Sequence, residues 1–318
     1  MNKKIFIIFT SLVTILCGII FAKNLKKVGK NHHFTVGILQ TGSFPQLDAA
    51  RDGFIDTLKQ ALPDVEVMYQ NAEGSLNNAQ AIASSFKANK HIDAFYAIAT
   101  PAIQSLHHAI KERPIVFAAV TDPTGLGLIS PENAITGVTD MADIEKQIGI
   151  LIQLFPTLQK VSILYSPSEV NSVILAKKME KELIKHNVSY RLNGVGSIAD
   201  VPAATRNAAQ WSKLILIPTD HILTVTFPIV EQISSEKNIP IVTTWTGQKD
   251  GALLKFGVDY YESGVRAAQQ MIEILVDNKN CASIPLKKPS SKIFIDADLA
   301  KKFNVTLSDE LKKSVTFM

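Results

Sequence analysis

The chain has 318 residues, of which 46% are hydrophobic and 19% charged, so it can bury a sizeable core and is neither a disordered tail nor a mini-protein that needs disulfides. Of its 33 basic residues, six are lysines in residues 1–30, which hold no acid; the 27 that remain face 29 acidic residues, a net charge of −2. Residues 31–318 therefore lack the positive field that holds a polyphosphate, so the composition argues against nucleic-acid binding.

Residues 1–30 are typical of an export signal. Two lysines precede an uncharged, mostly apolar stretch from Ile5 to Ala22, and a lysine-rich polar segment follows it. The stretch is just long enough to span a bilayer, so it predicts either a signal peptide cleaved near Ala22 or a retained N-terminal anchor. Cys17 follows Leu16 rather than the small residue that lipoprotein processing prefers, which favours an ordinary cysteine. We therefore expect an extracytoplasmic protein, in the periplasm or on the outer face of the inner membrane.

From residue 35 onward, short β-rich runs alternate with helical patterns. Thr35–Gln40 is an apolar run, and the next segment carries Leu47, Phe54 and Leu58 at helical spacing. The alternation continues to residue 141 and then starts again. It predicts an α/β fold with two doubly wound parallel-sheet lobes around a central cleft.

Three strand motifs recur at a nearly constant distance along the chain. VGILQ at Val36 recurs as VSILY at Val161, AIATP around Thr100 as LIPTD around Thr219, and PIVFAAV at Pro114 as PIVTTW at Pro240. The offsets are 125, 119 and 126 residues. This repetition supports two related lobes whose corresponding strand ends face each other.

Polar side chains follow the predicted strands at their carboxyl ends, where open parallel sheets bind ligands. They are Gln40, Thr41, Ser43, Thr100, Thr121, Asp122, Ser166, Ser168, Glu169, Thr219, Asp220, Thr243, Thr244 and Thr246. Each hydroxyl alone is explained by helix capping, but six such ends in two facing lobes indicate a shared polar ligand site. Helix N-termini at these turns suit a carboxylate, and Asp122, Asp220 and Asp259 suit an ammonium group, so the pattern favours a zwitterionic solute.

Motifs for catalysis and metal binding are sparse, and we expect no catalytic group, metal or cofactor. One segment, Gly194-Val195-Gly196-Ser197-Ile198-Ala199, resembles a dinucleotide fingerprint, with Asp220 lying 24 residues past its second glycine. The strand before it carries Arg191 and Asn193 where a buried parallel strand should be apolar. An exported α/β enzyme with a dinucleotide-type site at this segment is the alternative hypothesis.

Eight segments, in order from residue 35 to the C-terminus, resemble the ABC-transporter substrate-binding proteins of the tryptophan/tyrosine-binding type. They are LDAARDGF (47–54), YQNAEG (69–74), AIATPAIQ (97–104), PIVFAAVTDPTGLGL (114–128), ITGVTDM (135–141), LYSPSEVNS (164–172), LIPTD (216–220) and GVDYYESG (257–264). The resemblance implies a type I periplasmic-binding-protein fold that captures a small solute by lobe closure. In this family the solute is typically an amino acid, often aromatic, and it is delivered to a membrane permease powered by a separate ATPase.

The resemblance also implies how the chain divides. Residues 1–30 would be the signal peptide or anchor, 31–140 plus 259–283 the first lobe, and 141–258 plus 284–318 the second. The crossovers between the lobes would lie near 139–143, 258–260 and 284–288. A monomer suits delivery to a permease, and a ligand-sensing domain that serves a signalling partner is a third hypothesis.

Ten residues at the strand ends are the candidate ligand-binding residues. They are Gln40, Thr100, Thr121, Asp122, Ser168, Glu169, Asn171, Ser172, Asp220 and Asp259. The turn at 168–172 opens a helix whose N–H groups suit the carboxylate, and either Asp220 or Asp259 would meet the ammonium group. The turns at Phe44, His221 and Trp245 depart from the family pattern. Phe44 and Trp245 are candidates both for stacking on an aromatic solute and for simple packing.

Overall fold

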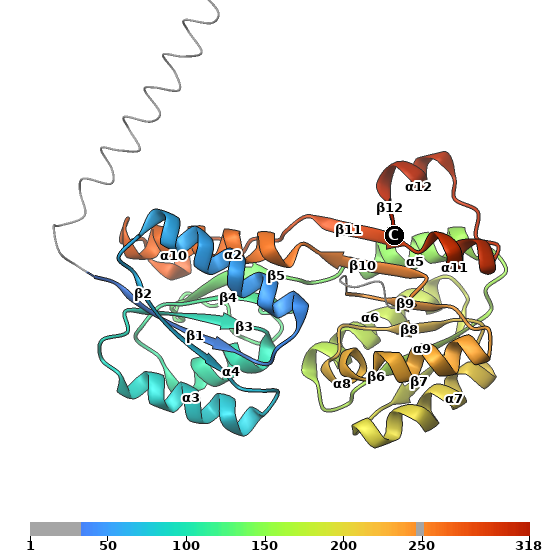
Figure 1. The fold of residues 1–318 in the computed structure, drawn as a ribbon, viewed down its shortest axis with the longest axis horizontal. Helices are drawn as coiled ribbons and strands as arrows, with labels where there is room; N and C mark the ends of the chain where they lie inside the picture. The colour runs from blue at the N-terminus through green and yellow to red at the C-terminus, as the bar shows by residue number, and fades with distance from the viewer. Residues whose placement is uncertain (1–32, 246–250) are drawn as a thin grey trace, which may run out of the picture.

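The computed structural model describes residues 33–245 and 251–318, which form two α/β lobes side by side, each around one sheet (Figure 1). The predicted signal or anchor at residues 1–30 lies outside the described residues. Within the described part of the chain, no helix combines the length and the apolar character needed to cross a membrane.

The first lobe is built on a five-stranded parallel sheet in the order β2-β1-β3-β4-β5. Its strands are β1 (Thr35–Gln40), β2 (Glu66–Asn71), β3 (Ala94–Ile98), β4 (Ile115–Val120) and β5 (Ile135–Thr139). Helices α2 (Pro45–Ala61) and α10 (Tyr260–Leu275) cover one face of the sheet, and α3 (Leu76–Ala88) and α4 (Thr100–Ala109) cover the other (Figure 1). The strands β1, β3 and β4 are buried throughout, as expected of parallel strands covered on both faces.

The second lobe is built on a seven-stranded sheet in the order β12-β11-β10-β9-β8-β6-β7. Its strands are β6 (Lys160–Tyr165), β7 (Ser189–Gly194), β8 (Ile215–Ile217), β9 (Ile241–Thr243), β10 (Leu254–Val258), β11 (Ser291–Ile295) and β12 (Thr316–Phe317). One face packs on α5 (Ile144–Leu154) and α6 (Val170–Lys185), and the other on α7 (Val201–Trp211) and α9 (Phe227–Glu236). Its shorter helices are α8 (His221–Val225), α11 (Ala297–Lys302), α12 (Asp309–Ser314) and η1 (Ile198–Asp200), while η2 (Cys281–Ser283) packs on the first lobe.

This architecture confirms the predicted α/β fold with two lobes and mainly parallel sheets. The pair β10–β11 is a departure, because these two neighbours run antiparallel. The strand β10 leads out of the second lobe into α10 and β11 leads back into it, so the two strands run in opposite directions.

Three connections join the lobes, and hydrogen bonds and an ion pair link these connections to neighbouring segments. They run from β5 to α5, from β10 to α10 and from η2 to β11. The first and third are joined by backbone hydrogen bonds, from Thr139 N to Lys287 O at 2.9 Å and from Lys287 N to Gly137 O at 3.0 Å. The second connection is joined to β11, which follows the third, by the ion pair between Lys292 Nζ and Asp259 Oδ2, at 2.7 Å.

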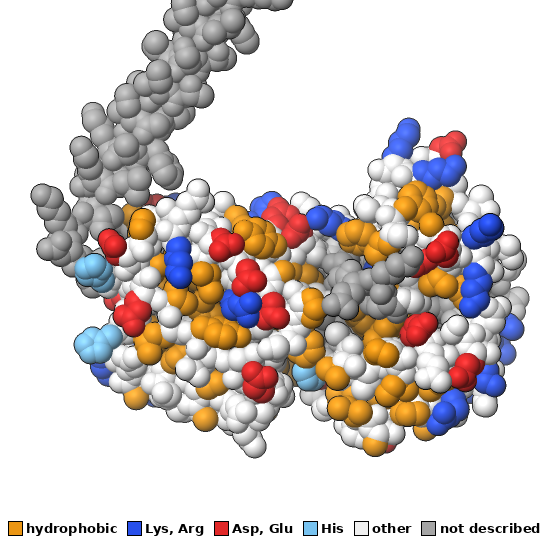
Figure 2. Space-filling view, in the orientation of Figure 1, with side chains coloured by type: hydrophobic (Ala, Val, Ile, Leu, Met, Phe, Trp, Pro, Cys, Tyr) orange, Lys and Arg blue, Asp and Glu red, His pale blue; other side chains and the backbone are white. Residues whose placement is uncertain are grey.

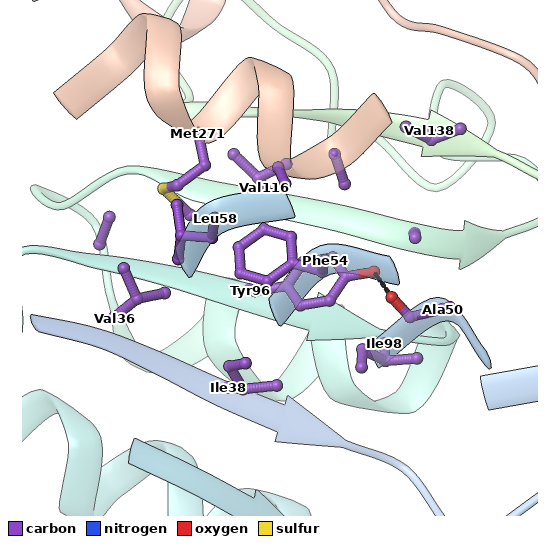
Figure 3. Close-up of a cluster of buried hydrophobic side chains, with 14 of the residues drawn as sticks. Val36, Ile38, Ala50, Phe54, Leu58, Tyr96, Ile98, Val116, Val138 and Met271 are labelled. Atoms are coloured by element: carbon purple, nitrogen blue, oxygen red, sulfur yellow. Dashed lines mark hydrogen bonds between the residues drawn. The ribbon is translucent and has the colours of Figure 1, made fainter. Parts of the chain in front are cut away.

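The core of the first lobe centres on a stacked aromatic pair (Figure 3). The rings of Phe54 and Tyr96 lie 3.8 Å apart between centroids, with an interplanar angle of 7°. The Tyr96 hydroxyl donates a hydrogen bond of 3.1 Å to the carbonyl of Ala50, so the one polar atom of this buried side chain is satisfied. Met271 of α10 reaches the same cluster. This cluster therefore joins α2, β3 and α10, although α10 follows a strand of the second lobe.

Helices α2 and α10 cross in backbone contact at two glycines. A Cβ atom built on Gly264 would overlap the carbonyl oxygen of Ala50 and lie 2.7 Å from the backbone nitrogen of Phe54. A Cβ atom on Gly53 would overlap the carbonyl oxygen of Tyr261. The close approach fixes the start of α10, and with it the second connection between the lobes.

Replacing Gly264 with alanine should therefore destabilise the protein. The new methyl group meets backbone atoms that move only if the helices separate, and overpacking of this kind costs about 1–3 kcal/mol. The matched control is Gly149→Ala in α5, where a Cβ meets no described atom within 4 Å. That change should stabilise by about 0.5–1 kcal/mol, because alanine favours a helix over glycine. Urea unfolding measures both, and equal effects in the two variants would contradict the close crossing.

Candidate functional site

A cavity with an empty volume of about 660 Å³, open to solvent, lies between the two lobes. Figure 2 shows the lobes meeting along a narrow junction. The walls of the cavity come from the carboxyl ends of strands in both sheets and from the segments that connect the lobes. The lining residues are Thr41, Phe44, Gln46, Leu47, Ala99, Thr100, Pro101, Ala119, Thr121, Asp140, Glu169, Asn171, Thr219, Asp220, His221, Thr224, Trp245 and Tyr260.

Two alanines on the first-lobe wall have left-handed backbone conformations. The φ angle is 77° at Ala99, just after β3, and 59° at Ala119, inside β4. The pairing of β4 with β5 shifts register at this point. Such a conformation costs an alanine roughly 1–2 kcal/mol, and strained backbone of this kind clusters at functional sites. The strain therefore supports a binding role for this edge of the sheet.

The helix α4 presents an uncapped N-terminus to the cavity. Its N-cap residue, Ala99, makes no side-chain hydrogen bond, and Thr100 and Pro101 of its first turn line the cavity. The first N–H groups of a helix have no partner within the helix, and together with the helix dipole they favour an anion. The ten-residue helix α4 therefore offers a site for a carboxylate.

On the second-lobe wall, two carboxylates hold the N-terminus of α8. The Glu169 carboxylate accepts hydrogen bonds from His221 N at 2.9 Å and Ile222 N at 3.2 Å. Asp220 Oδ1 accepts from Leu223 N at 2.9 Å, and Asp220 Oδ2 accepts from Ser172 Oγ at 2.6 Å and Ser166 N at 2.7 Å. Both side chains thus have local partners that fix the turns around them.

The same wall is acidic and largely shielded from water. Burial raises the pKa of Glu169 to about 7, the nearby Asp220 carboxylate raises it as well, and the amides of residues 221 and 222 act in the opposite direction. Burial also raises the pKa of Asp220. Since the described lining residues include neither lysine nor arginine, the cavity favours a cation over an anion on this side.

Of the ten predicted ligand-binding residues, five line the cavity. Thr100 follows β3 and Thr121 follows β4, while Glu169, Asn171 and Asp220 lie on the opposite wall. Their sequence signal is their place at the carboxyl end of a strand.

The other five predicted residues do not line the cavity, and each makes a hydrogen bond or ion pair with another residue. Gln40 Nε2 donates to Gly42 O at 2.7 Å, and Asp122 Oδ1 accepts from Gly125 N at 2.9 Å within its own turn. Ser168 Oγ lies 2.9 Å from Ser166 Oγ, and Ser172 Oγ donates to Asp220 Oδ2 without lining the cavity itself.

Asp259 is the fifth predicted residue that lies outside the cavity. Its Oδ1 caps α10 by accepting from Glu262 N at 3.0 Å, and its Oδ2 pairs with Lys292. Its carboxylate is therefore engaged at the connection between the lobes, and it does not line the cavity.

The sequence analysis missed several lining residues, of which Asp140 and Tyr260 matter most. Asp140 follows β5 directly, as Thr121 follows β4, but it fell within a segment assigned to a crossover. The Tyr260 hydroxyl donates to Asp140 Oδ2 at 3.2 Å. The strand-end pattern that identified Thr100 and Thr121 also applies to Asp140 and could have found it.

The aromatic residues of the three turns that depart from the family pattern, Phe44, His221 and Trp245, line the cavity. The ring of Phe44, in the first lobe, meets the His221 ring of the second lobe edge to face, with centroids 4.7 Å apart. Trp245 packs edge to face on Phe227 at 5.8 Å. The Phe44–His221 contact closes one side of the cavity across the two lobes.

The segment Gly194–Ala199 lies away from the cavity. It begins at the last residue of β7, an edge strand of the second sheet. Ser197 Oγ donates to Asp200 Oδ2 at 2.9 Å, whereas a phosphate would need free donors. The Asp220 carboxylate that completes the fingerprint is already engaged by Ser172 and Leu223. The structure therefore does not combine this segment with the cavity into one site.

Known proteins with this fold include solute-binding proteins. The family model for ABC transporter substrate binding proteins matches residues 35–317. The tyrosine-binding protein of Clostridioides difficile (strain R20291) is 31% identical over 286 residues, which is 87% of this chain and 82% of that protein.

Two solved structures allow a comparison of shape. The ABC domain in complex with L-Trp from Streptococcus pneumoniae has a TM-score of 0.82 at 26% identity, over 89% of this chain and 99% of that chain. The ligand-free, open structure of a substrate binding protein with adhesive properties from Clostridium difficile has a TM-score of 0.71 at 25% identity, over 90% of this chain and 99% of that chain.

The raised pKa of Glu169 predicts a pH dependence of stability without ligand. Between pH 4.5 and 7 the folded protein keeps a proton that the unfolded chain has released, so stability falls as the pH rises through this window, by at most about 1.4 kcal/mol per pH unit. Glu169→Gln should flatten this slope in thermal melts. The exposed Glu132→Gln is the control, and a wild-type slope in Glu169→Gln would refute the assignment.

Proposed function

Because the chain belongs to the family of ABC transporter substrate-binding proteins, we propose that it captures an amino acid and delivers it to a membrane permease powered by a separate ATPase. The relatives whose names state a ligand bind tyrosine or L-Trp. An aromatic amino acid is therefore the first solute to test.

The uncapped N-terminus of α4 and the carboxylates on the same cavity are the observation that carries this proposal. A solute with one carboxylate and one ammonium group complements both. The turn at 168–172 also opens a helix on the cavity, but Glu169 stands at its N-cap and its charge disfavours a second carboxylate there. We therefore assign the solute carboxylate to α4.

Aromatic side chains supply the apolar part of the proposed site. Phe44, Trp245 and Tyr260 line the cavity together with Leu47 and Pro101. Ligand sites typically combine such apolar walls with a few convergent polar groups. These aromatic and aliphatic side chains suit the indole or phenol ring of an aromatic amino acid.

Lobe closure is the proposed mechanism of capture. Partners on both lobes can contact one small solute only when the lobes are together, so the solute favours the closed state. The Phe44–His221 contact across the lobes supports a closed arrangement here. The higher TM-score with the L-Trp complex than with the open, ligand-free structure supports it as well, because the two sequence identities are nearly equal.

The proposed place of action is outside the cytoplasm, where residues 1–30 would export or anchor the chain. We propose that it acts as a monomer, which suits delivery to a permease. We also propose that it needs no cofactor, since capture and release of a solute require no covalent step. Nucleic acid is not among the proposed partners.

Thermal unfolding of the full chain in mild detergent tests this function. The unfolding is recorded with each of the twenty amino acids and with nucleosides, sugars, oligopeptides and NAD. A ligand at about 100 times its Kd stabilises by roughly 2.7 kcal/mol, which raises the melting temperature by about 5 °C. We expect this shift with one or a few aromatic amino acids. It should shrink in Thr100→Ala and persist in Thr124→Ala, an exposed threonine outside the cavity. A shift with NAD alone would favour the enzyme hypothesis instead.

A further inference from the structure

Asp140 carries a buried carboxylate oxygen with no proper hydrogen-bond donor. Its Oδ2 accepts a hydrogen bond from the Tyr260 hydroxyl at 3.2 Å, while its Oδ1 is buried and accepts no well-oriented hydrogen bond from any described residue. Leaving a buried charged group unpaired is costly, so such an atom on a cavity wall points to a donor that arrives with the ligand.

The other carboxylates near the cavity are already engaged. Glu169 accepts two backbone amides of α8, and Asp220 accepts three hydrogen bonds from Ser166, Ser172 and Leu223. Asp259 caps α10 and pairs with Lys292 outside the cavity. Of these acidic side chains, Asp140 is the one with an oxygen left for a new donor.

The position of Asp140 also suits a solute held at α4. The strands β3, β4 and β5 are neighbours, α4 begins after β3, and Asp140 follows β5. Two strand spacings of about 4.8 Å separate the ends of β3 and β5 by about 10 Å. Thr100 and Pro101 of α4 line the same cavity as Asp140, so one small solute between these strand ends can meet both.

We infer that Asp140 binds the α-ammonium group of the solute and that Tyr260 is its positioning residue. This inference deepens the proposed function and rests on it. Burial raises the pKa of the Asp140 carboxyl, an effect that the Thr121 and Tyr260 hydroxyls and the charge of Lys288 only partly offset. A cationic ammonium group adds the missing partner.

The assignment places ligand recognition at the connections between the lobes. Asp140 lies in the segment that joins β5 to α5, and Tyr260 begins α10 immediately after the second connection. The backbone of Asp140 is held by a hydrogen bond from its N–H to Val120 O at 3.2 Å. An ammonium group on Asp140 therefore touches the segments about which the lobes would turn.

The test compares amino acids with their deaminated counterparts. Calorimetric titration of the full chain in mild detergent uses L-tyrosine and L-tryptophan against 3-(4-hydroxyphenyl)propionate and indole-3-propionate. Asp140→Asn should weaken amino-acid binding about 10- to 100-fold, as expected for a hydrogen bond to a charged group, and change binding of the deaminated acids less than 3-fold. Tyr260→Phe should give a smaller loss that is also selective for the amino acids.

The control is Asp122→Asn, the same substitution at the next strand end but outside the cavity, which should leave both ligand classes unchanged. If Asp140→Asn fails to fold, the selective loss in Tyr260→Phe decides. Equal losses for both ligand classes, or no loss, would overturn the role of Asp140 while leaving the solute-binding function intact. A wild-type chain that binds no amino acid would instead refute the proposed function, and this inference with it.

Discussion

The alignment of parallel strands determines where the polar groups of this protein lie. Parallel strands end at the same edge of a sheet, about 4.8 Å from their neighbours, and each connection after a strand begins at that edge. Thr100, Thr121 and Asp140 therefore form a row across three adjacent strands of the first sheet, and Glu169 and Asp220 occupy the corresponding edge of the second. The cavity results from two such edges meeting, and the backbone contact between α2 and α10 helps to keep them in place.

Burial gives the acidic residues of the cavity two different tasks. A buried carboxylate must find donors, and Glu169 and Asp220 find them in the free N–H groups of α8 and in the turn that precedes α6. Their negative charge stabilises the N-terminus of α8, a helix of only five residues. Asp140 Oδ2 accepts from the Tyr260 hydroxyl, while its Oδ1 is buried and accepts no well-oriented hydrogen bond from any described residue. The number of local donors, rather than the type of side chain, thus separates the structural carboxylates from the one available to a ligand.

Sequence patterns predicted the layers of the fold and about half of the cavity wall. Alternating strands and helices identified both lobes because parallel strands such as β1 and β4 are apolar throughout. The polar residues of β7, Arg191 and Asn193, looked unsuited to a parallel strand, but β7 is the exposed edge of its sheet, where only one neighbour must be paired. Position after a strand identified Thr100 and Asp220, yet it did not show which way Asp122, Ser172 or Asp259 would turn. That direction depends on partners such as Gly125 and Lys292, which the pattern does not specify.

Two of the three turns that depart from the family pattern, those at Phe44 and His221, meet each other across the lobes. His221 contacts Phe44 edge to face, and its Nε2 also leaves no room for a side chain on Gly74, where a Cβ would lie 2.9 Å away. Gly74 has a φ angle of 74°, which favours glycine for a second reason. A change at Phe44 or Gly74 would alter the surroundings of His221, so these three residues form one contact between the lobes. They lie beside the cavity, so the contact between the lobes, as well as the groups that line the cavity, shapes the proposed solute site.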